Sequence, residues 1–268
     1  MDVAASPSGA TAPWDRVAAG DDARLQRRGG AGGRRASGSA VVTGVRVDCH
    51  VHTVASGDSV LAIEELAARS VAEGVDVVFV TDHHEVAAAL AAQRRDLGVR
   101  ILVGEEVRTP DGEVLGLFLT ERIPYVLPLH EVLARIRAQG GIAGLPHPYD
   151  PVRSGTGAVA DELCAAGLVQ FVEGFNAKVG DAAHNAAAAA LAARHGLPVT
   201  AGSDAHDGPG VGAAYVEMPD FDGPADFLDA LARGRLVGEL RPHARRFSAA
   251  LTGDVTYRTI ETDSRAGF

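Results

Sequence analysis

The sequence predicts an α/β protein in which short parallel strands alternate with helices and close into a TIM-like barrel of seven strands. Apolar segments of strand length alternate with segments of helix length from about residue 41 to residue 240. Such an alternation is typical of a parallel sheet. The chain has 268 residues, 46% of them hydrophobic, which is enough for one large core and ordinary for a single barrel.

The predicted strands are short runs dominated by Val, Ile, Leu and Ala, as expected for strands that are buried on both faces. In chain order they cover residues 41–48, 76–81, 100–103, 113–119, 142–145, 168–173 and 198–201. A further extended piece over residues 213–218 follows them.

The predicted helices lie mostly between these strands, and most of them stop directly before a glycine. They cover residues 59–73, 85–97, 129–139, 159–166, 181–195 and 224–233. The glycines that follow the first five are Gly74, Gly98, Gly140, Gly167 and Gly196. Glycine readily adopts the left-handed conformation that ends a helix, so these residues support the helix boundaries.

Both ends of the chain differ in composition from the middle. The first residues are rich in Ala, Gly, Ser, Pro and Arg, and the run from Gly29 to Gly33 cannot pack a core. We predict a disordered leader over 1–40, a barrel domain over 41–240 and a C-terminal tail over 241–268. The arginines of the leader could contact an acidic partner, although a solvated tail is the simpler interpretation.

The charge excludes a nucleic-acid binder of the basic-surface type, because the formal charge is −10. The leader holds six Arg and four Asp, so the rest of the chain carries about −12. The sequence has no apolar run of the roughly 18 residues that a membrane span needs, and no signal-peptide core. Cys49 and Cys164 are isolated from each other, which makes a reducing cytoplasm the simplest location.

The first predicted strand ends in a His-x-His pattern formed by His50 and His52. Residues two apart on a strand point to the same face, so both imidazoles are expected on one side. Neutral imidazole is a good ligand for zinc, manganese and iron. By itself the pattern leaves open whether these histidines bind a metal ion or are unrelated residues at a strand end.

Ionisable residues also follow the ends of other strands. The six groups are Asp48–His52, Asp82–His84, Glu105–Glu106, His147, Glu173–Asn176 and Ser203–His206. The carboxyl ends of the strands in a parallel barrel meet at one face, so these groups are expected to converge there. Unpaired, they would be costly to bury, and they exceed the three protein ligands of a typical catalytic zinc. We therefore predict two or three divalent ions; the alternative is a set of unrelated polar caps.

Five of these motifs, in their order, resemble the PHP (polymerase and histidinol phosphatase) family. They are His50-Val51-His52-Thr53, Thr81-Asp82-His83, Gly104-Glu105-Glu106, His147-Pro148 and Gly202-Ser203-Asp204-Ala205-His206. The resemblance covers residues 45–212. It implies a distorted (βα)7 barrel, a trinuclear metal centre at the C-terminal ends of the strands, and hydrolysis of phosphoesters.

The resemblance also implies a set of metal ligands in this sequence. The first ion would be held by His50, His52, Glu106 and Asp204. Glu106 would bridge to a second ion that His147 also binds. The third ion would take Asp58, His83 and His206. Glu106, Asp204 and His206 are accordingly the expected catalytic residues. The ions implied are Zn, Mn or Fe.

One position departs from the family pattern. The family often has a histidine on the strand after the bridging glutamate, as a ligand of the second ion, and this chain has Glu113 there. A carboxylate can also ligate a metal, so Glu113 is retained as a candidate ligand. Of the adjacent Glu105 and Glu106, only one can face the barrel axis, and the Gly-x-Glu spacing of the family selects Glu106.

Other polar residues at the same face are expected to orient the ligands or to meet the substrate. Asp82, Glu173 and Asn176 are candidates for orienting metal ligands. Arg153 and Lys178, the only lysine, lie on loops at this face and could bind a phosphate, with ordinary surface charge as the alternative.

The leading functional hypothesis is hydrolysis of a small phosphoester, a phosphomonoester or a nucleotide-like compound, by a metal-bridging hydroxide. An acidic body without a basic track argues against extended nucleic acid as a partner. The alternatives are an amidohydrolase-type metal hydrolase and a catalytically silent PHP barrel that acts as a ligand-binding regulatory module. The carboxylated lysine common in dinuclear amidohydrolases lies on a middle strand, whereas Lys178 lies outside an apolar strand run. This position counts against the amidohydrolase alternative. The sequence leaves the oligomeric state open.

Overall fold

The computed structural model describes residues 44–241, so the predicted leader and all but Arg241 of the predicted tail lie outside the described residues. The strands are β1 (Gly44–Val51), β2 (Val77–Val80), β3 (Arg100–Thr109), β4 (Gly112–Leu117), β5 (Ile142–Leu145), β6 (Phe171–Asn176), β7 (Val199–Gly202), β8 (Ala214–Pro219) and β9 (Arg235–Gly238). The helices are α1 (Ile63–Glu73), α2 (Ala87–Ala92), α3 (Leu129–Ala138), α4 (Ala160–Ala165), α5 (Ala182–His195) and α6 (Pro224–Leu231), with the 3-10 turns η1 (Val54–Ser56) and η2 (Gly208–Gly210). Among these helices, none combines the length and the apolar character that crossing a membrane would require.

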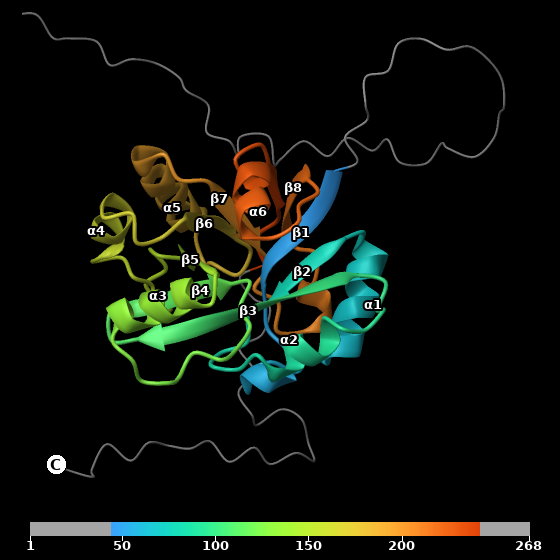
Figure 1. The fold of residues 1–268 in the computed structure, drawn as a ribbon. Coiled ribbons are helices and arrows are strands. Elements are labelled where there is room, and N and C mark those ends of the chain that lie inside the picture. The colour runs from blue at the N-terminus through green and yellow to red at the C-terminus, as the bar shows by residue number, and fades with distance from the viewer. Residues whose placement is uncertain (1–43, 242–268) are drawn as a thin grey trace, which may run out of the picture.

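The strands form one sheet in the order β7-β6-β5-β4-β3-β2-β1-β8-β9. The helices α1 and α2 lie beside β1 to β3, and α3, α4 and α5 lie on the side of β4 to β7 (Figure 1). The sheet nearly closes where β7 approaches β1. There the backbone N–H of Asp204 donates to the carbonyl of His50 at 2.8 Å, and the N–H of His52 donates to the carbonyl of Ala205 at 3.0 Å. The predicted α/β barrel is confirmed.

The sheet is mixed, so the prediction of an all-parallel sheet was wrong. The strand β4 runs antiparallel to both β3 and β5, and β8 runs antiparallel to β1. A parallel connection needs a crossover of about a dozen residues or more. The link from residue 103 to residue 113 is shorter than that, and β3 uses most of it by continuing to Thr109. The strand β9, which pairs with β8, was not predicted.

The predicted helices differ from the structure by one or two residues, except for α1 and α2, which are clearly shorter than predicted. The helix α1 begins at Ile63 instead of residue 59, because the hydroxyl of Ser59 bonds the carbonyls of His52 and His206, each at 3.0 Å. These bonds hold the segment before α1 against the ends of β1 and β7. The helix α2 covers only Ala87–Ala92 of the predicted 85–97.

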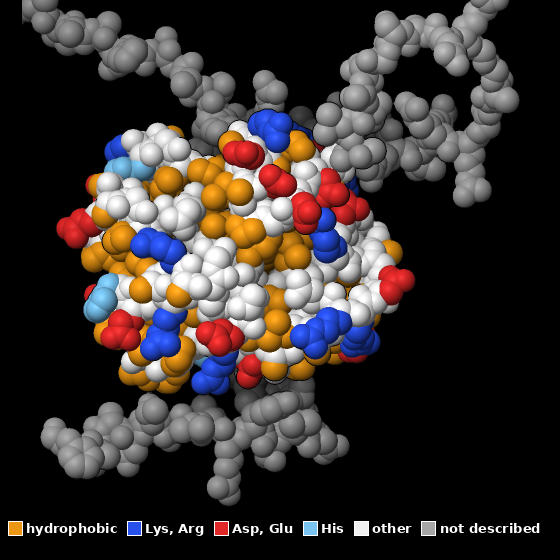
Figure 2. Space-filling view, in the orientation of Figure 1, with side chains coloured by type: hydrophobic (Ala, Val, Ile, Leu, Met, Phe, Trp, Pro, Cys, Tyr) orange, Lys and Arg blue, Asp and Glu red, His pale blue; other side chains and the backbone are white. Residues whose placement is uncertain are grey.

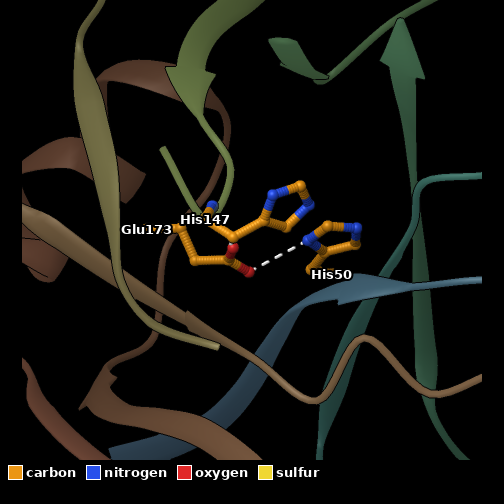
Figure 3. A group of neighbouring side chains, drawn as sticks. All are labelled: His50, His147 and Glu173. Carbon is orange, nitrogen blue, oxygen red and sulfur yellow. Dashed lines mark hydrogen bonds and ion pairs between the residues drawn. The ribbon is translucent and has the colours of Figure 1, made fainter. Parts of the chain in front are cut away.

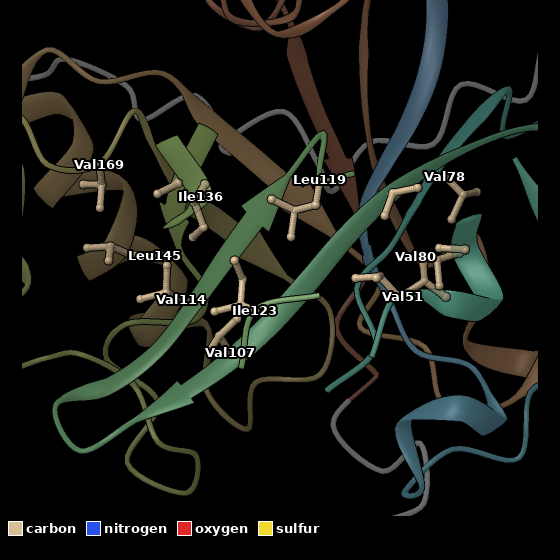
Figure 4. Close-up of a cluster of buried hydrophobic side chains, with 14 of the residues drawn as sticks. Val51, Val78, Val80, Val107, Val114, Leu119, Ile123, Ile136, Leu145 and Val169 are labelled. Atoms are coloured by element: carbon tan, nitrogen blue, oxygen red, sulfur yellow. The ribbon is translucent and has the colours of Figure 1, made fainter. Parts of the chain in front are cut away.

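Apolar side chains fill both sides of the sheet. An outer cluster, which includes Val78, Val107 and Ile136, packs between the strands and the helices (Figure 4). An inner cluster includes Leu115 and Phe171 from the strands, and the partly buried Leu102 packs against it. On β3, Leu102 and Glu106 lie on the same face, because they are four residues apart on a strand. The inner apolar cluster therefore forms the floor beneath the ionisable residues at the strand ends.

Aromatic rings from the helix α6 and from β2 complete this floor. Phe79 of β2 is fully buried, and its ring centroid lies 5.0 Å from that of Phe118 and 5.4 Å from that of Phe227 on α6. All three rings meet edge to face, with interplanar angles of 71° or more. Such contacts stabilise the fold beyond the effect of buried area alone.

We expect Phe79→Ala to lower the free energy of unfolding by about 3–5 kcal/mol, because it removes a buried ring and leaves a cavity. Val71→Ala is the control, since Val71 lies on α1 with 52% of its surface exposed. Denaturant unfolding of both variants and the wild type measures the difference. A loss below about 1 kcal/mol for Phe79→Ala, the level of a surface change, would contradict this account of the floor.

Candidate metal centre

A β-bulge near the end of β1 turns two histidines into the barrel. The pairing of β1 with β2 shifts register between Asp48 and Val51. As a result His50 and His52 follow the inner apolar residue Cys49 on the same face. Both imidazoles are fully buried, and their Nε2 atoms lie 3.0 Å apart. Two nitrogen atoms this close can share one bound cation.

The carboxylate of Glu106, at the end of β3, stands at the centre of the histidines. Its Oε2 atom lies 3.4 Å from Nε2 of His50, 3.2 Å from Nε2 of His52 and 3.3 Å from Nδ1 of His83. Its Oε1 atom lies 3.0 Å from Nε2 of His147. The two oxygen atoms therefore face different sets of imidazoles, as a carboxylate that bridges two cations would.

The adjacent glutamates differ in their surroundings. Burial alone would raise the pKa of Glu106, but His50 and His83 outweigh it and hold that pKa well below its usual range. Glu105 instead accepts a hydrogen bond from the backbone N–H of Ile123 at 2.8 Å, and burial raises its pKa to about 7. The structure thus brings Glu106, rather than Glu105, into the cluster.

The loop after β7 contributes Asp204 and His206. The Oδ1 atom of Asp204 lies 3.5 Å from Nε2 of His52 and 3.9 Å from Nε2 of His50. It also lies 3.5 Å from Nδ1 of His206. Asp204 has a φ of 50°, in the left-handed region that Asp and Asn tolerate better than most residues. This backbone conformation turns its carboxylate back toward β1.

A third group of candidate ligands lies toward the outside of the cluster. The Oδ2 atom of Asp58, just after η1, lies 3.4 Å from Nε2 of His83 and 3.6 Å from Nε2 of His206. Burial would raise the pKa of Asp58, yet the neighbouring imidazoles of His206 and His83 hold it well below its usual range. Asp58 therefore stays a carboxylate that can serve as a ligand.

The residue that departs from the expected pattern, Glu113, also points into the cluster. It comes from β4, is nearly fully buried, and its Oε2 atom lies 3.8 Å from Nε2 of His147. Ligand atoms of Glu113, Glu106 and His83 lie within 4.8 Å of one another. The carboxylate thus lies close both to His147 and to the His83–Glu106 pair, where it could serve as a ligand.

Arg153 and Lys178 reach the cluster as partners of Asp204. The guanidinium of Arg153 pairs with Asp204 through Nη1 and donates to Oδ1 of Asn176 at 3.0 Å through Nη2. The Nζ atom of Lys178 lies 2.9 Å from Nδ1 of His206 and 3.6 Å from Oδ1 of Asp204. Burial, with Arg153 nearby, lowers the pKa of Lys178 to about 8, so it remains cationic at neutral pH.

The donor atoms present fit divalent cations. Among the residues that the structure describes, five groups of three offer ligand atoms that lie within 4.8 Å of one another: His50–His147–Glu173, His50–His52–Glu106, His52–Asp204–His206, His52–Asp58–His83 and His83–Glu106–Glu113. Within residues 44–241, Asp58 Oδ1, His83 Nδ1 and His147 Nδ1 are buried without a hydrogen-bond partner. Unsatisfied buried polar atoms are costly, and a mixed set of imidazoles and carboxylates is typical of zinc, manganese and iron sites.

Comparisons with known proteins identify the family of this chain. The sequence signature of the PHP domain matches residues 48–141, and a PHP-associated signature matches residues 182–236. An uncharacterized protein of Methanocaldococcus jannaschii is 34% identical over 197 residues, which cover 70% of this chain and 79% of that protein. The chain belongs to the PHP domain family. A second uncharacterized protein of the same organism is 33% identical over 139 residues, covering 47% of this chain and 81% of that protein.

A solved PHP structure shares the fold. It is a two-domain protein of Bacteroides vulgatus that contains a predicted PHP-like metal-dependent phosphoesterase. The TM-score is 0.59 at 18% sequence identity, with 78% of this chain and 70% of that chain covered. At this identity the likeness supports the PHP barrel fold and leaves the reaction to be argued from the residues of this chain.

Within this PHP domain, the residues expected to orient ligands lie directly behind them. Glu173 Oε1 accepts from Nδ1 of His50 at 2.9 Å (Figure 3). Glu173 Oε2 accepts from the backbone N–H of His147 at 2.8 Å. The bond at Nδ1 leaves Nε2 of His50 to face the cluster. Asn176 joins Glu173 to Asp204 through hydrogen bonds of 3.0 and 3.1 Å.

The remaining orienting candidate, Asp82, supports the loop rather than an imidazole. Its carboxylate accepts from the hydroxyl of Thr53 at 2.7 Å and from the Thr53 backbone N–H. Burial raises the pKa of Asp82 to about 6, although the hydrogen bonds from Thr53 act to lower it. Asp82 thereby fixes the turn that follows His52.

Three polar residues around this PHP centre were given no role of their own in the sequence analysis. Asp48 Oδ1 accepts from the N–H of Ser203 at 3.0 Å, which joins the ends of β1 and β7. Ser56 Oγ lies 3.0 Å from Nδ1 of His52, and Arg108 Nη2 lies 2.7 Å from Nε2 of His83. Arg108 stands two residues after Glu106 on one face of β3, a spacing that indicates it only once the strand is known to continue past residue 103.

We expect Gly202→Ala to reduce metal content and activity, because a Cβ atom at this position would overlap Cβ of His50 and Oε1 of Glu173. The overlap must displace the His50–Glu173 pair, and losing such an orienting contact commonly costs about 10–100-fold in metal affinity or activity. Gly180→Ala is the matched control, since nothing lies within 4 Å of its Cβ position. Elemental analysis and turnover of both variants measure the effect; equal metal content in the two would contradict it.

Proposed function

We propose that this PHP domain is a metal-dependent hydrolase of small phosphoesters. The observation that carries the proposal is the position of Glu106, whose two carboxylate oxygens face His50 and His52 on one side and His147 on the other. One ion would be held by His50, His52, Glu106 and Asp204, a second by Glu106, His147 and Glu113, and a third by Asp58, His83 and His206. Bound divalent ions would supply an acidified water and neutralise the charge of a phosphoryl group.

The side chains of this chain have separate tasks in that reaction. Glu173 holds His50 by its Nδ1 atom, so that the ring presents Nε2 to the site. Arg153 and Lys178 lie beside Asp204 with side-chain exposures of 19% and 16%, and we assign them to binding the substrate phosphate. A guanidinium can bind a phosphate through two parallel hydrogen bonds, while an ammonium acts as a compact charge.

The distribution of charge supports a small substrate. The formal charge of the chain is −10, and an extended polyanion would need a track of basic residues to bind. On the face shown in Figure 2, Lys and Arg side chains are scattered among acidic and hydrophobic ones. The cations that we assign to the substrate, Arg153 and Lys178, give a local positive site suited to one or two phosphates.

A screen of substrates and metals tests this proposal. The protein is stripped of metal, reloaded with Mn, Zn or Fe, and assayed against phosphomonoesters, phosphodiesters, amides and lactones. We expect phosphate release that depends on the ion and stops when a chelator is added. Hydrolysis of amides or lactones without any phosphoester would overturn the proposal in favour of an amidohydrolase, and metal binding without any hydrolysis would favour a regulatory barrel.

A further inference from the structure

The hairpin of β3 and β4 carries a charged pair at the edge of the metal centre. Arg108 and Glu113 are direct cross-strand partners in the antiparallel register. The Nε atom of Arg108 donates to Oε1 of Glu113 at 2.9 Å. The side chain of Glu113 is 4% exposed, whereas that of Arg108 is 49% exposed. The pair therefore joins a carboxylate inside the barrel to a guanidinium at its mouth.

The two oxygen atoms of Glu113 consequently face different groups. Oε1 is held by Arg108, and Oε2 lies 3.8 Å from Nε2 of His147. His147 in turn lies 3.0 Å from Oε1 of Glu106. One oxygen of Glu113 is therefore left for the position between His147 and Glu106, and a bidentate arrangement toward that position would break the bond to Arg108.

The charge of Arg108 also acts on this position. Two carboxylates, those of Glu106 and Glu113, lie 3.0 and 3.8 Å from Nε2 of His147. Arg108 compensates one of their negative charges, so a divalent ion would meet one net negative charge there instead of two. Arg108 Nη2 also lies 2.7 Å from Nε2 of His83, and since a guanidinium only donates, that nitrogen accepts.

We propose that Arg108 is a positioning residue that turns Glu113 into a one-oxygen ligand and thereby sets the metal preference of the Glu106–Glu113–His147 position. Two carboxylate oxygens and one imidazole nitrogen form an oxygen-rich set. Carboxylate oxygens suit manganese, while imidazole-rich and thiolate sets suit zinc. This position accordingly prefers Mn²⁺ over Zn²⁺ relative to the histidine-rich position of His50 and His52. The inference rests on the proposed metal centre but not on the reaction that it performs.

The test is a direct measurement of metal binding, without substrate. Wild type, Arg108→Gln, Glu113→Gln and the double variant are stripped of metal, dialysed against equal concentrations of Mn²⁺ and Zn²⁺, and analysed for both elements. Arg95→Gln is the matched control, because Arg95 forms a 2.7 Å pair with Glu64 on the surface. Calorimetric titration with Mn²⁺ alone gives the affinity of each variant.

We expect Arg108→Gln to lower the affinity of one Mn²⁺ equivalent by roughly 10-fold or more, in the range of other orienting contacts. The double variant should have the same Mn²⁺ affinity as Glu113→Gln, because Arg108 acts through Glu113. Arg95→Gln should have the Mn²⁺ affinity of the wild type. Unchanged stoichiometry and Mn/Zn ratio in Arg108→Gln, or independent effects of the two substitutions, would overturn the inference alone. A wild type that binds neither ion would overturn it together with the proposed function.

Discussion

Replacing Glu106 with glutamine is expected to remove at least one bound metal ion and to lower kcat/KM by roughly 100-fold or more. Substitutions of groups that only orient metal ligands commonly cost 10–100-fold, and Glu106 stands among the ligands themselves. Its carboxylate lies within 3.4 Å of imidazole nitrogens from His50, His52, His83 and His147. Glutamine keeps the shape and removes the charge, so the imidazoles would remain while the bridge between two cations is lost.

The adjacent residue supplies a matched control for this substitution. Glu105 is also buried, yet its carboxylate accepts from the N–H of Ile123 and takes no part in the ligand groups found within residues 44–241. Glu105→Gln should therefore retain the metal content and turnover of the wild type. Elemental analysis and steady-state kinetics of both variants decide the matter. A Glu106→Gln protein with full metal content, or a larger loss of bound metal in Glu105→Gln than in Glu106→Gln, would show that the bridging carboxylate is misassigned.

The second large effect is expected for Asp204→Asn. Asp204 faces His50 and His52 and also pairs with Arg153 and Lys178. Loss of its charge would leave Lys178 and Arg153 beside the position of the first ion with one carboxylate fewer to oppose them, although Arg153 keeps its 3.1 Å pair with Asp150. We expect that ion to be lost and kcat/KM to fall by roughly 100-fold or more, beyond the range of orienting contacts.

Two further variants separate charge from backbone effects at this position. Asparagine tolerates the φ of 50° at residue 204, whereas alanine there should cost about 1–2 kcal/mol of stability in addition. Asp207→Asn is the control on the same loop, because asparagine can keep the cap to the N–H of Gly210. Metal content, kinetics and thermal unfolding are compared across the three variants. Wild-type metal content in Asp204→Asn would contradict a ligand role for Asp204.

The sequence was sufficient to predict the barrel and the meeting of most candidate site residues at one face, for a physical reason. In a barrel of parallel strands, functional residues lie at the carboxyl ends of the strands, which meet at one face. Residues far apart in the chain, such as His52, Glu106 and Asp204, could therefore be expected at that face before their contacts were known. The family resemblance then separated Glu106 from Glu105. Both inferences needed only the order of the motifs and the period of a strand.

Features that depend on tertiary contacts were missed. The antiparallel course of β4 follows from the short link after residue 103, and the pattern of apolar residues alone cannot show direction. The pairing of Arg153 with Asp204 joins residues from two loops, and neither loop indicates its partner. Arg108 lay beyond the predicted end of its strand at residue 103, so its place beside Glu113 could not be seen until β3 was known to extend to Thr109.

Stepwise metal reconstitution tests the central claim most directly. Protein stripped by a chelator is titrated with Mn²⁺ while bound metal and phosphate release from a small phosphomonoester are measured in the same samples. The account predicts no turnover without metal, and turnover that returns as more than one equivalent is bound, because Glu106 faces two groups of imidazoles. Full phosphate release by the metal-free protein, or saturation of binding below one equivalent, would contradict it.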